Sequence, residues 1–192
     1  YGFFTPGKEP RKVVGGVPDL VVAELEKHKA MVYRPNTYGA GQGITYDPAI
    51  LKYIWEQLAL RSGVRLLFHT HFVDAVLEGN RVTGVIAFNK AGFLRIKAGV
   101  VIDASGDADV AAAAGVPFES AREGPVQSLT TTFRMINVDD ARARQVKKAQ
   151  LHELMAKAVE SGKYDLPRKE GSVHITPLPG VMATNMTRVG DV

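Results

Sequence analysis

The spacing of apolar residues predicts two helices in the first third of the chain. The first covers residues 18–30, where the apolar side chains share one face. Asp47 and Pro48 mark the start of the second helix, because an acidic residue caps a helix and proline fits its first turn; Gly63 ends it. Between the two helices, the glycine-rich segment 33–46 (YRPNTYGAGQGITY) is expected to form a loop.

The middle of the chain alternates between apolar and polar residues, which is typical of strands. Residues 64–70 (VRLLFHT) predict one strand. Residues 72–99 predict a β-meander of about three strands with turns at residues 79–80 and 91–92. The apolar run at residues 100–103 (VVID) predicts a short strand of the kind that is buried in a parallel sheet.

The last third of the chain has a different pattern. Residues 128–138 alternate as a strand, and Asp139 caps a long helix that extends to about Ser161. Two further strands are expected in residues 172–178 and 181–189. The order of elements indicates an α/β (mixed α+β) fold, in which most of a nucleotide-binding domain is joined to the start of a second, α+β region.

Composition excludes several classes of protein. The chain has 192 residues and no cysteine, so disulfides and thiolate metal sites are excluded and a cytoplasmic location is expected. The net charge is +4, but the charges are mixed and form no basic stripe with aromatics, so we expect no nucleic-acid partner. No apolar run reaches the roughly 18 residues of a membrane span. Because the sequence starts at Tyr1 without methionine, we expect it to be part of a longer protein.

The segment 100–115 (VVIDASGDADVAAAAG) predicts a strand, a tight turn and a helix, a junction that can hold a cofactor. Small residues at 104–106 let another group approach the backbone closely. Asp107 is expected to cap the helix, and Asp109 lies in its first turn. Both acids would repel a phosphate at this helix end, so the turn suits a secondary contact to a ribose or pyrophosphate edge. The alternative is a well-capped helix without a ligand.

Two other motifs give only weak indications of a binding site. Gly39 to Gly43 (GAGQG) is only loosely similar to the dinucleotide fingerprint, because no long apolar strand leads into it. His69 and His71 are expected on one face of a strand, where they could chelate a metal, but no third ligand is evident. We therefore expect no metal site and no nucleophile elbow.

Residues 63–119 resemble the FAD-dependent oxidoreductases of the glutathione-reductase-like superfamily. The family's "DPxxLK" helix start is matched from Asp47 to Lys52, and its "GRVTGV"-like strand by residues 80–85, with asparagine replacing the first glycine. Its "IDATGDGDVAxxAG" turn is matched by residues 102–115, with Ser105 and Ala108 in place of threonine and glycine. A substrate-domain strand ending in "FRM" is matched by residues 131–135.

This resemblance implies FAD as the cofactor and a two-domain organisation. Residues 1–119 are expected to form a partial FAD-binding Rossmann-like domain with a β-meander, and residues 120–192 part of an α+β substrate or cap domain. The family's GxGxxG unit and its C-terminal FAD-contacting segment are not in the sequence. The expected partners are therefore those segments of the same chain and a small-molecule substrate.

The resemblance also implies which residues face the cofactor and the substrate. Val73 would contact adenine through its backbone, and the turn after Asp103 would lie against the FAD pyrophosphate and ribose. The expected cofactor-side residues are Val73, Ala104, Ser105, Gly106 and Asp107; the expected substrate-side residues are Gln127, Thr131 and Arg134. Arg134 would bind an anionic substrate or form a surface ion pair. The resemblance points to no particular catalytic acid or base.

The function implied is transfer of hydride or electrons between FAD and an unidentified small molecule. An alternative is a non-catalytic binding or assembly module that keeps a flavoprotein-like scaffold. A pyridine-nucleotide dehydrogenase is a weaker alternative, because the meander before residues 100–106 fits FAD domains better.

Overall fold

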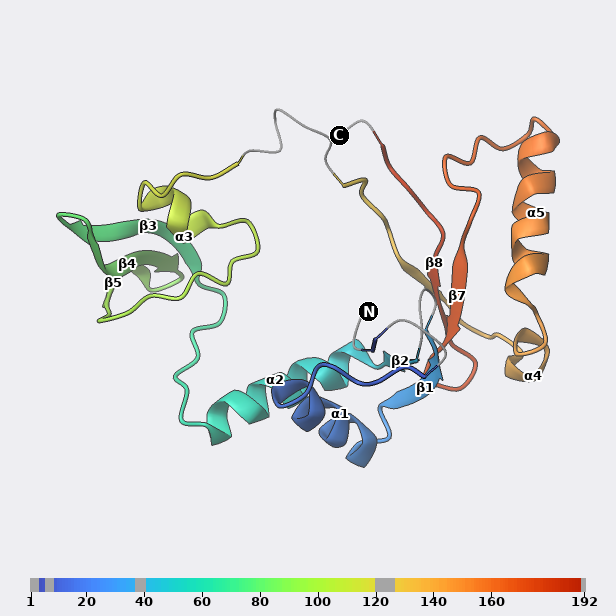
Figure 1. The fold of residues 1–192 in the computed structure, drawn as a ribbon, viewed down its shortest axis with the longest axis horizontal. Coiled ribbons are helices and arrows are strands. Elements are labelled where there is room, and N and C mark those ends of the chain that lie inside the picture. The colour runs from blue at the N-terminus through green and yellow to red at the C-terminus, as the bar shows by residue number, and fades with distance from the viewer. Residues whose placement is uncertain (1–3, 6–8, 37–40, 120–126, 191–192) are drawn as a thin grey trace. The chain divides into compact units, whose positions relative to one another are not determined.

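The computed structural model describes residues 4–5, 9–36, 41–119 and 127–190 (Figure 1). The chain divides into two compact units, residues 1–64 with 127–192 and residues 65–126. This division does not test the predicted assignment of residues 1–119 to a cofactor domain and residues 120–192 to a substrate domain, which stays a prediction. The mixed α/β class is confirmed by helices and several antiparallel sheets.

The two predicted helices of the first unit are confirmed and carry its core. Helix α1 covers Val17–Lys27 and α2 covers Pro48–Arg61. The Asp47 carboxylate caps α2 by accepting a hydrogen bond of 2.8 Å from the backbone N–H of Ala49. The apolar faces of the helices meet in a cluster of fully or nearly buried side chains: Val21, Leu25, Ala30 and Ile54.

The described parts of the glycine-rich segment between these helices are two paired strands, so the loop predicted there is wrong. Strand β1 (Met31–Pro35) pairs antiparallel with β2 (Gln42–Tyr46), with Met31 opposite Tyr46. Met31 and Ile44 pack against the helical core. The first two residues of the GAGQG motif lie outside the described residues. The loop was predicted because this segment is rich in glycine and contains a proline, and both residues are rare in strands. Pairing with a neighbouring strand and packing on a core can nevertheless stabilise a strand of such composition.

A second sheet and two helices complete this unit. The sheet has the order β6-β8-β7, with β6 at Phe133–Met135, β7 at Ser172–Ile175 and β8 at Met182–Asn185, all antiparallel. The predicted strands are thus confirmed, although each is shorter than expected. Because Thr184 is buried and its hydroxyl donates to the Phe133 carbonyl at 2.9 Å, β8 is well anchored as the central strand.

The predicted long helix from Asp139 to Ser161 is wrong, because the structure has two helices there. Asp139 caps α4 (Asp140–Ala143) through the backbone N–H of Arg142 at 3.1 Å. A second capping contact follows, in which the Gln150 side chain accepts from the backbone N–H of Lys147 at 2.8 Å. This contact starts α5 (Lys148–Glu160) as a new helix.

The second unit is the predicted β-meander, which is confirmed. Strands β3 (His71–Glu78), β4 (Arg81–Asn89) and β5 (Gly92–Lys97) pair antiparallel in the order β3-β4-β5. Both hairpin turns use a glycine in a left-handed conformation, at Gly79 (φ 60°) and Gly92 (φ 103°). A short helix, α3 (Asp109–Ala113), contacts β3.

Two predicted strands of this unit are absent from its described residues. Residues 64–70 include turns, and His69 has φ 52°. Residues 100–103 pair with no strand in the described part, and Val100 and Ile102 are 81% and 86% exposed. A buried parallel strand needs neighbours on both sides, and an apolar run alone cannot provide them.

Each helix that the structure describes is either too short or too polar to traverse a bilayer.

Candidate functional site

The turn before α3 is organised by the carboxylate of Asp103. It accepts three backbone hydrogen bonds, from Ser105 at 3.0 Å, Val110 at 3.0 Å and Ala111 at 2.9 Å. These bonds, that from Ser105 first, lower the pKa of Asp103 because they favour its charged form. Asp103 therefore links the extended segment before the turn to the first turn of the helix.

The predicted capping role of Asp107 is wrong, since Asp103 and Ser105 supply it. The Ser105 hydroxyl accepts from the backbone N–H of Asp109 at 3.0 Å, and Asp107 is exposed. The residue at the N-cap position is Ala108, with a left-handed backbone (φ 59°, ψ 35°). The related motif has glycine there, a residue that adopts this conformation without strain. The prediction of Asp107 as the cap failed because capping residues are usually adjacent to the helix. Here the chain reverses after Asp103, which brings the Asp103 carboxylate back to the first turn of α3.

The exposed part of this turn consists of small residues. Ala104, Ser105 and Gly106 are all exposed, and Gly106 has φ 96° with no heavy atom within 4 Å of where a Cβ would be. A ligand can approach this backbone closely. The first amides of α3 are already bound to Asp103 and Ser105, so a phosphate could not use them. The geometry fits a secondary contact to a large cofactor and does not fit its main phosphate cradle.

Val73 lies in the same unit as this turn. The pairing of β3 with β4 shifts register between Phe72 and Asp74, and Val73 is the residue at that irregularity. Its side chain is 47% exposed, and β3 is an edge strand of the three-stranded sheet. Backbone groups at a bulge on an edge strand are available to a ligand.

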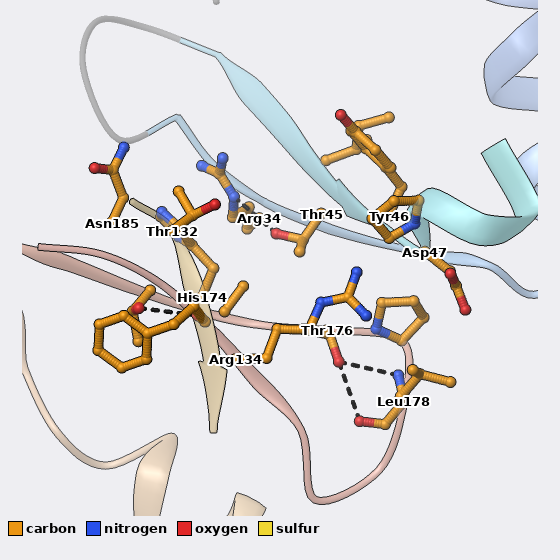
Figure 2. A pocket seen from close by; sticks show the side chains of 16 residues that line it. Arg34, Thr45, Tyr46, Asp47, Thr132, Arg134, His174, Thr176, Leu178 and Asn185 are labelled. Atoms are coloured by element: carbon orange, nitrogen blue, oxygen red, sulfur yellow. Dashed lines mark hydrogen bonds between the residues drawn. The ribbon is translucent and has the colours of Figure 1, made fainter. Parts of the chain in front are cut away.

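The other unit contains a pocket of about 330 Å³ between the β1–β2 hairpin and the second sheet (Figure 2). Arg34, Thr45 and Tyr46 line it from the hairpin side. Thr132, Arg134 and His174 line it from the sheet side, and Asp47 lies at the start of α2. The pocket thus gathers cationic, hydroxyl and apolar groups from segments that are far apart in the sequence.

His174 lies in this pocket close enough to Arg34 for the arginine's charge to affect its pKa. The half-buried Arg34 donates through Nε to the Thr45 hydroxyl at 3.1 Å and through a terminal nitrogen to the Pro35 carbonyl at 3.0 Å. His174 is half-buried, and its Nε2 lies 3.1 Å from the Ser172 hydroxyl. Burial, followed by the positive charge of Arg34, lowers the pKa of His174. The neutral imidazole is therefore favoured. The other ionisable side chains among the described lining residues are those of Arg34, Arg134, Tyr46 and Asp47.

Comparison with known proteins identifies the family. A family model described as FAD dependent oxidoreductase matches residues 2–192. The chain belongs to the FAD dependent oxidoreductase family. Searches of curated proteins and of solved structures found no match. The resemblance seen in residues 63–119 is therefore confirmed, and the family carries FAD-based redox chemistry.

The structure separates the substrate-side residues that the family resemblance implied. Arg134 lines the pocket of the first unit. Thr131 instead braces the sheet end: its backbone N–H donates to the Thr187 hydroxyl at 2.9 Å, and that hydroxyl donates to its carbonyl at 2.8 Å. Gln127 is exposed and lies outside the residues that line this pocket. Arg134 forms no ion pair within the part of the chain that the structure describes.

Arg34 and His174 are pocket residues that sequence reasoning missed. Arg34 lay in a segment expected to be a loop, and His174 was one of five histidines without a partner motif. A hairpin prediction for residues 31–46 would have pointed to Arg34. Nothing in the sequence around His174 indicates that it lies near Arg34.

The hypothesis of a histidine pair on one strand is not supported by the geometry. His69 lies before β3 in a left-handed turn, whereas His71 is the first residue of the strand. Among the described residues, no three His, Asp or Glu side chains gather as a metal ion would require.

Proposed function

We propose that this chain serves a flavin-dependent oxidoreductase by contacting FAD at the turn 104–107 and a small-molecule substrate in the other unit. When bound, FAD supplies the hydride or electron transfer. The chain's own residues bind and orient the FAD and the substrate. Family membership supports the cofactor, and the exposed turn braced by Asp103 supports the place of contact.

The turn carries the proposal because it is both accessible and held in place. Asp103 accepts one hydrogen bond from Ser105 in the turn and two from α3, which ties the turn to the helix, and the exposed residues of the turn have no large side chain. Rigid backbone with small side chains is what close approach of a dinucleotide requires. Asp107 is exposed beside it, where its charge disfavours a phosphate but can accept a hydrogen bond from a ribose hydroxyl. Val73, at the bulge of β3, is proposed to contact the adenine end.

Replacing Ala104 by glutamate tests this contact. Ala104 is exposed, so the variant is expected to fold normally. The new carboxylate would lie next to the proposed pyrophosphate, where like-charge repulsion is expected to weaken FAD binding by about tenfold or more. The measurement is the FAD dissociation constant of the full-length protein, from flavin fluorescence.

Ala91→Glu is the matched control, because Ala91 is exposed in the β4–β5 turn of the same unit. It is expected to leave FAD affinity unchanged. If Ala104→Glu and Ala91→Glu bind FAD equally well, the turn is not a cofactor contact. If the unaltered full-length protein binds no FAD, the alternative of a non-catalytic binding or assembly module is favoured.

A further inference from the structure

A second cavity of the first unit lies between its sheet and the segment that includes α4 and α5. Its volume is about 450 Å³, and Met135, Val173 and Met182 form its floor. The strand register places these three side chains on one face of the sheet, because side chains alternate along a strand. Arg134 neighbours Met135 in β6 and therefore points to the opposite face, where it lines the first pocket. The cavity thus uses the other face of the sheet.

The lining of this cavity is predominantly apolar. Besides the floor, apolar side chains come from the hairpin and from α4, α5 and the residues beside them: Pro35, Val138, Ala143, Val146 and Leu151. The polar residues in the lining are Arg34, Asn36, Lys147, Lys148, Ser172 and His174, and none of the described lining residues is acidic. The cavity is therefore an apolar space whose ionised side chains are basic.

Hydrogen bonds hold the walls of the cavity in place. Near α4, the Asp140 carboxylate accepts from the backbone N–H of Gly180 at 3.0 Å, and the backbone N–H of Val138 donates to the Gly180 carbonyl at 3.0 Å. On α5, Nε2 of His152 lies 3.1 Å from the carbonyl oxygen of Gly171, which precedes β7. The space between these anchored walls exceeds the small voids that native packing leaves, and its volume is in the range of small-molecule sites.

The chemistry of the lining favours an aromatic ligand. Met135 and Met182 are opposite each other in the β6–β8 pairing, which places two thioethers on the floor of the cavity. Thioether side chains adapt to irregular shapes and make favourable contacts with aromatic rings. Lys147, which forms no ion pair within the described part of the chain, adds a cation that attracts the face of an electron-rich ring.

The same lining disfavours an anionic ligand. Lys147 is exposed, and an ion pair with an exposed lysine contributes little to binding. A carboxylate or phosphate group would also lose hydration against the apolar walls. A neutral molecule avoids this cost.

We infer that this cavity binds a neutral, electron-rich aromatic molecule of one or two rings, held against Met135 and Met182 and near Lys147. The site is separate from the proposed FAD contact and from the pocket that Arg134 lines. It involves only residues of the first unit, so its occupancy does not depend on flavin.

Titration calorimetry of the full-length protein with three probes tests the inference. The probes are 2-naphthol, which is neutral and aromatic, its saturated analogue decahydro-2-naphthol, and the anion 2-naphthoate. We expect 2-naphthol to bind saturably and about three- to tenfold more tightly than either of the others, the range expected for sulfur–aromatic and cation–π contacts.

A matched pair of variants in α4 locates the binding. Ala143→Phe places a ring in the cavity and is expected to weaken 2-naphthol binding by about tenfold or more. Ala141→Phe adds the same ring to the same helix at an exposed position outside the lining and is expected to leave binding unchanged.

A third variant tests the thioethers without changing the size of the cavity. The double variant Met135→Leu/Met182→Leu nearly conserves volume, so it is expected to fold normally. It is expected to lose most of the preference for 2-naphthol over decahydro-2-naphthol, because leucine has no sulfur to contact the ring. This result does not depend on whether Ala143→Phe folds.

The inference is overturned if 2-naphthol does not bind saturably, or if either of the other probes binds as tightly. It is also overturned if folded Ala143→Phe and Ala141→Phe bind 2-naphthol alike, or if the double methionine variant keeps the full preference for the aromatic probe. The flavin content of the same samples, read from visible absorption, tests the proposed function separately.

Discussion

Replacing Leu25 by alanine is expected to lower the free energy of unfolding by about 2–5 kcal/mol. Leu25 is 0% exposed and lies at the centre of the cluster that joins α1 to α2. Its truncation removes buried methyl groups and leaves a cavity against Ile54, which is 2% exposed. Because Asp47 and Pro48 at the start of α2 also line the pocket, loosening this core is expected to loosen one pocket wall.

Leu20→Ala is the control for this prediction, because Leu20 belongs to the same helix and is 56% exposed. Its expected effect is within about 0.5 kcal/mol. Urea unfolding of the full-length protein, followed by the fluorescence of the single tryptophan Trp55 in α2, gives both values. Similar losses for the two variants would contradict the position of the core.

The second large effect is expected from Gly84→Ala in the β-meander. Gly84 is buried in β4 and lies opposite Lys97 of β5. A Cβ at this position would lie 2.2 Å from the backbone carbonyl oxygen of Ile96, closer than real contacts allow. The two strands must move apart to accept it, which is expected to cost about 1–3 kcal/mol, as overpacking does.

Gly99→Ala is the matched control in the same unit. A Cβ at Gly99 has no heavy atom within 4 Å, and its backbone is not left-handed. Amide hydrogen exchange of β4 and β5 measures the difference: exchange is expected to accelerate in Gly84→Ala and to stay unchanged in Gly99→Ala. Equal exchange in the two variants would show that the β4–β5 pairing tolerates a side chain at Gly84.

The elements that the sequence predicted well are those with local signals. Asp47 followed by Pro48 is sufficient to start α2, because the cap and the first turn are made by adjacent residues. The meander was equally visible, since glycines at residues 79 and 92 mark tight turns between alternating segments. In both cases the residues that form the structure lie within a few positions of one another.

The elements that sequence reasoning missed depend on partners farther away. The β1–β2 hairpin forms because Met31 and Ile44 pack on a helical core, and residues 100–103 have no paired strand among the described residues. The cap of α3 was also missed because it is made by a residue that is not adjacent to the helix. Asp103 reaches Ala111 across the turn, whereas proximity in sequence favoured Asp107.

The candidate site was predictable only in part for the same reason. Arg134 was identified through the family resemblance, and the structure places it at a pocket. Arg34 approaches that pocket from the other end of the chain, and His174 lies close enough to Arg34 for its pKa to be lowered. Such a cluster has no spacing motif, because three separate strands bring it together.

The visible absorption spectrum of the purified full-length protein is the most direct test of a flavin-dependent function. We expect a yellow protein with the bands of oxidised flavin, which bleach on addition of a reductant, and release of FAD on denaturation. A colourless protein that takes up no added FAD would contradict the account.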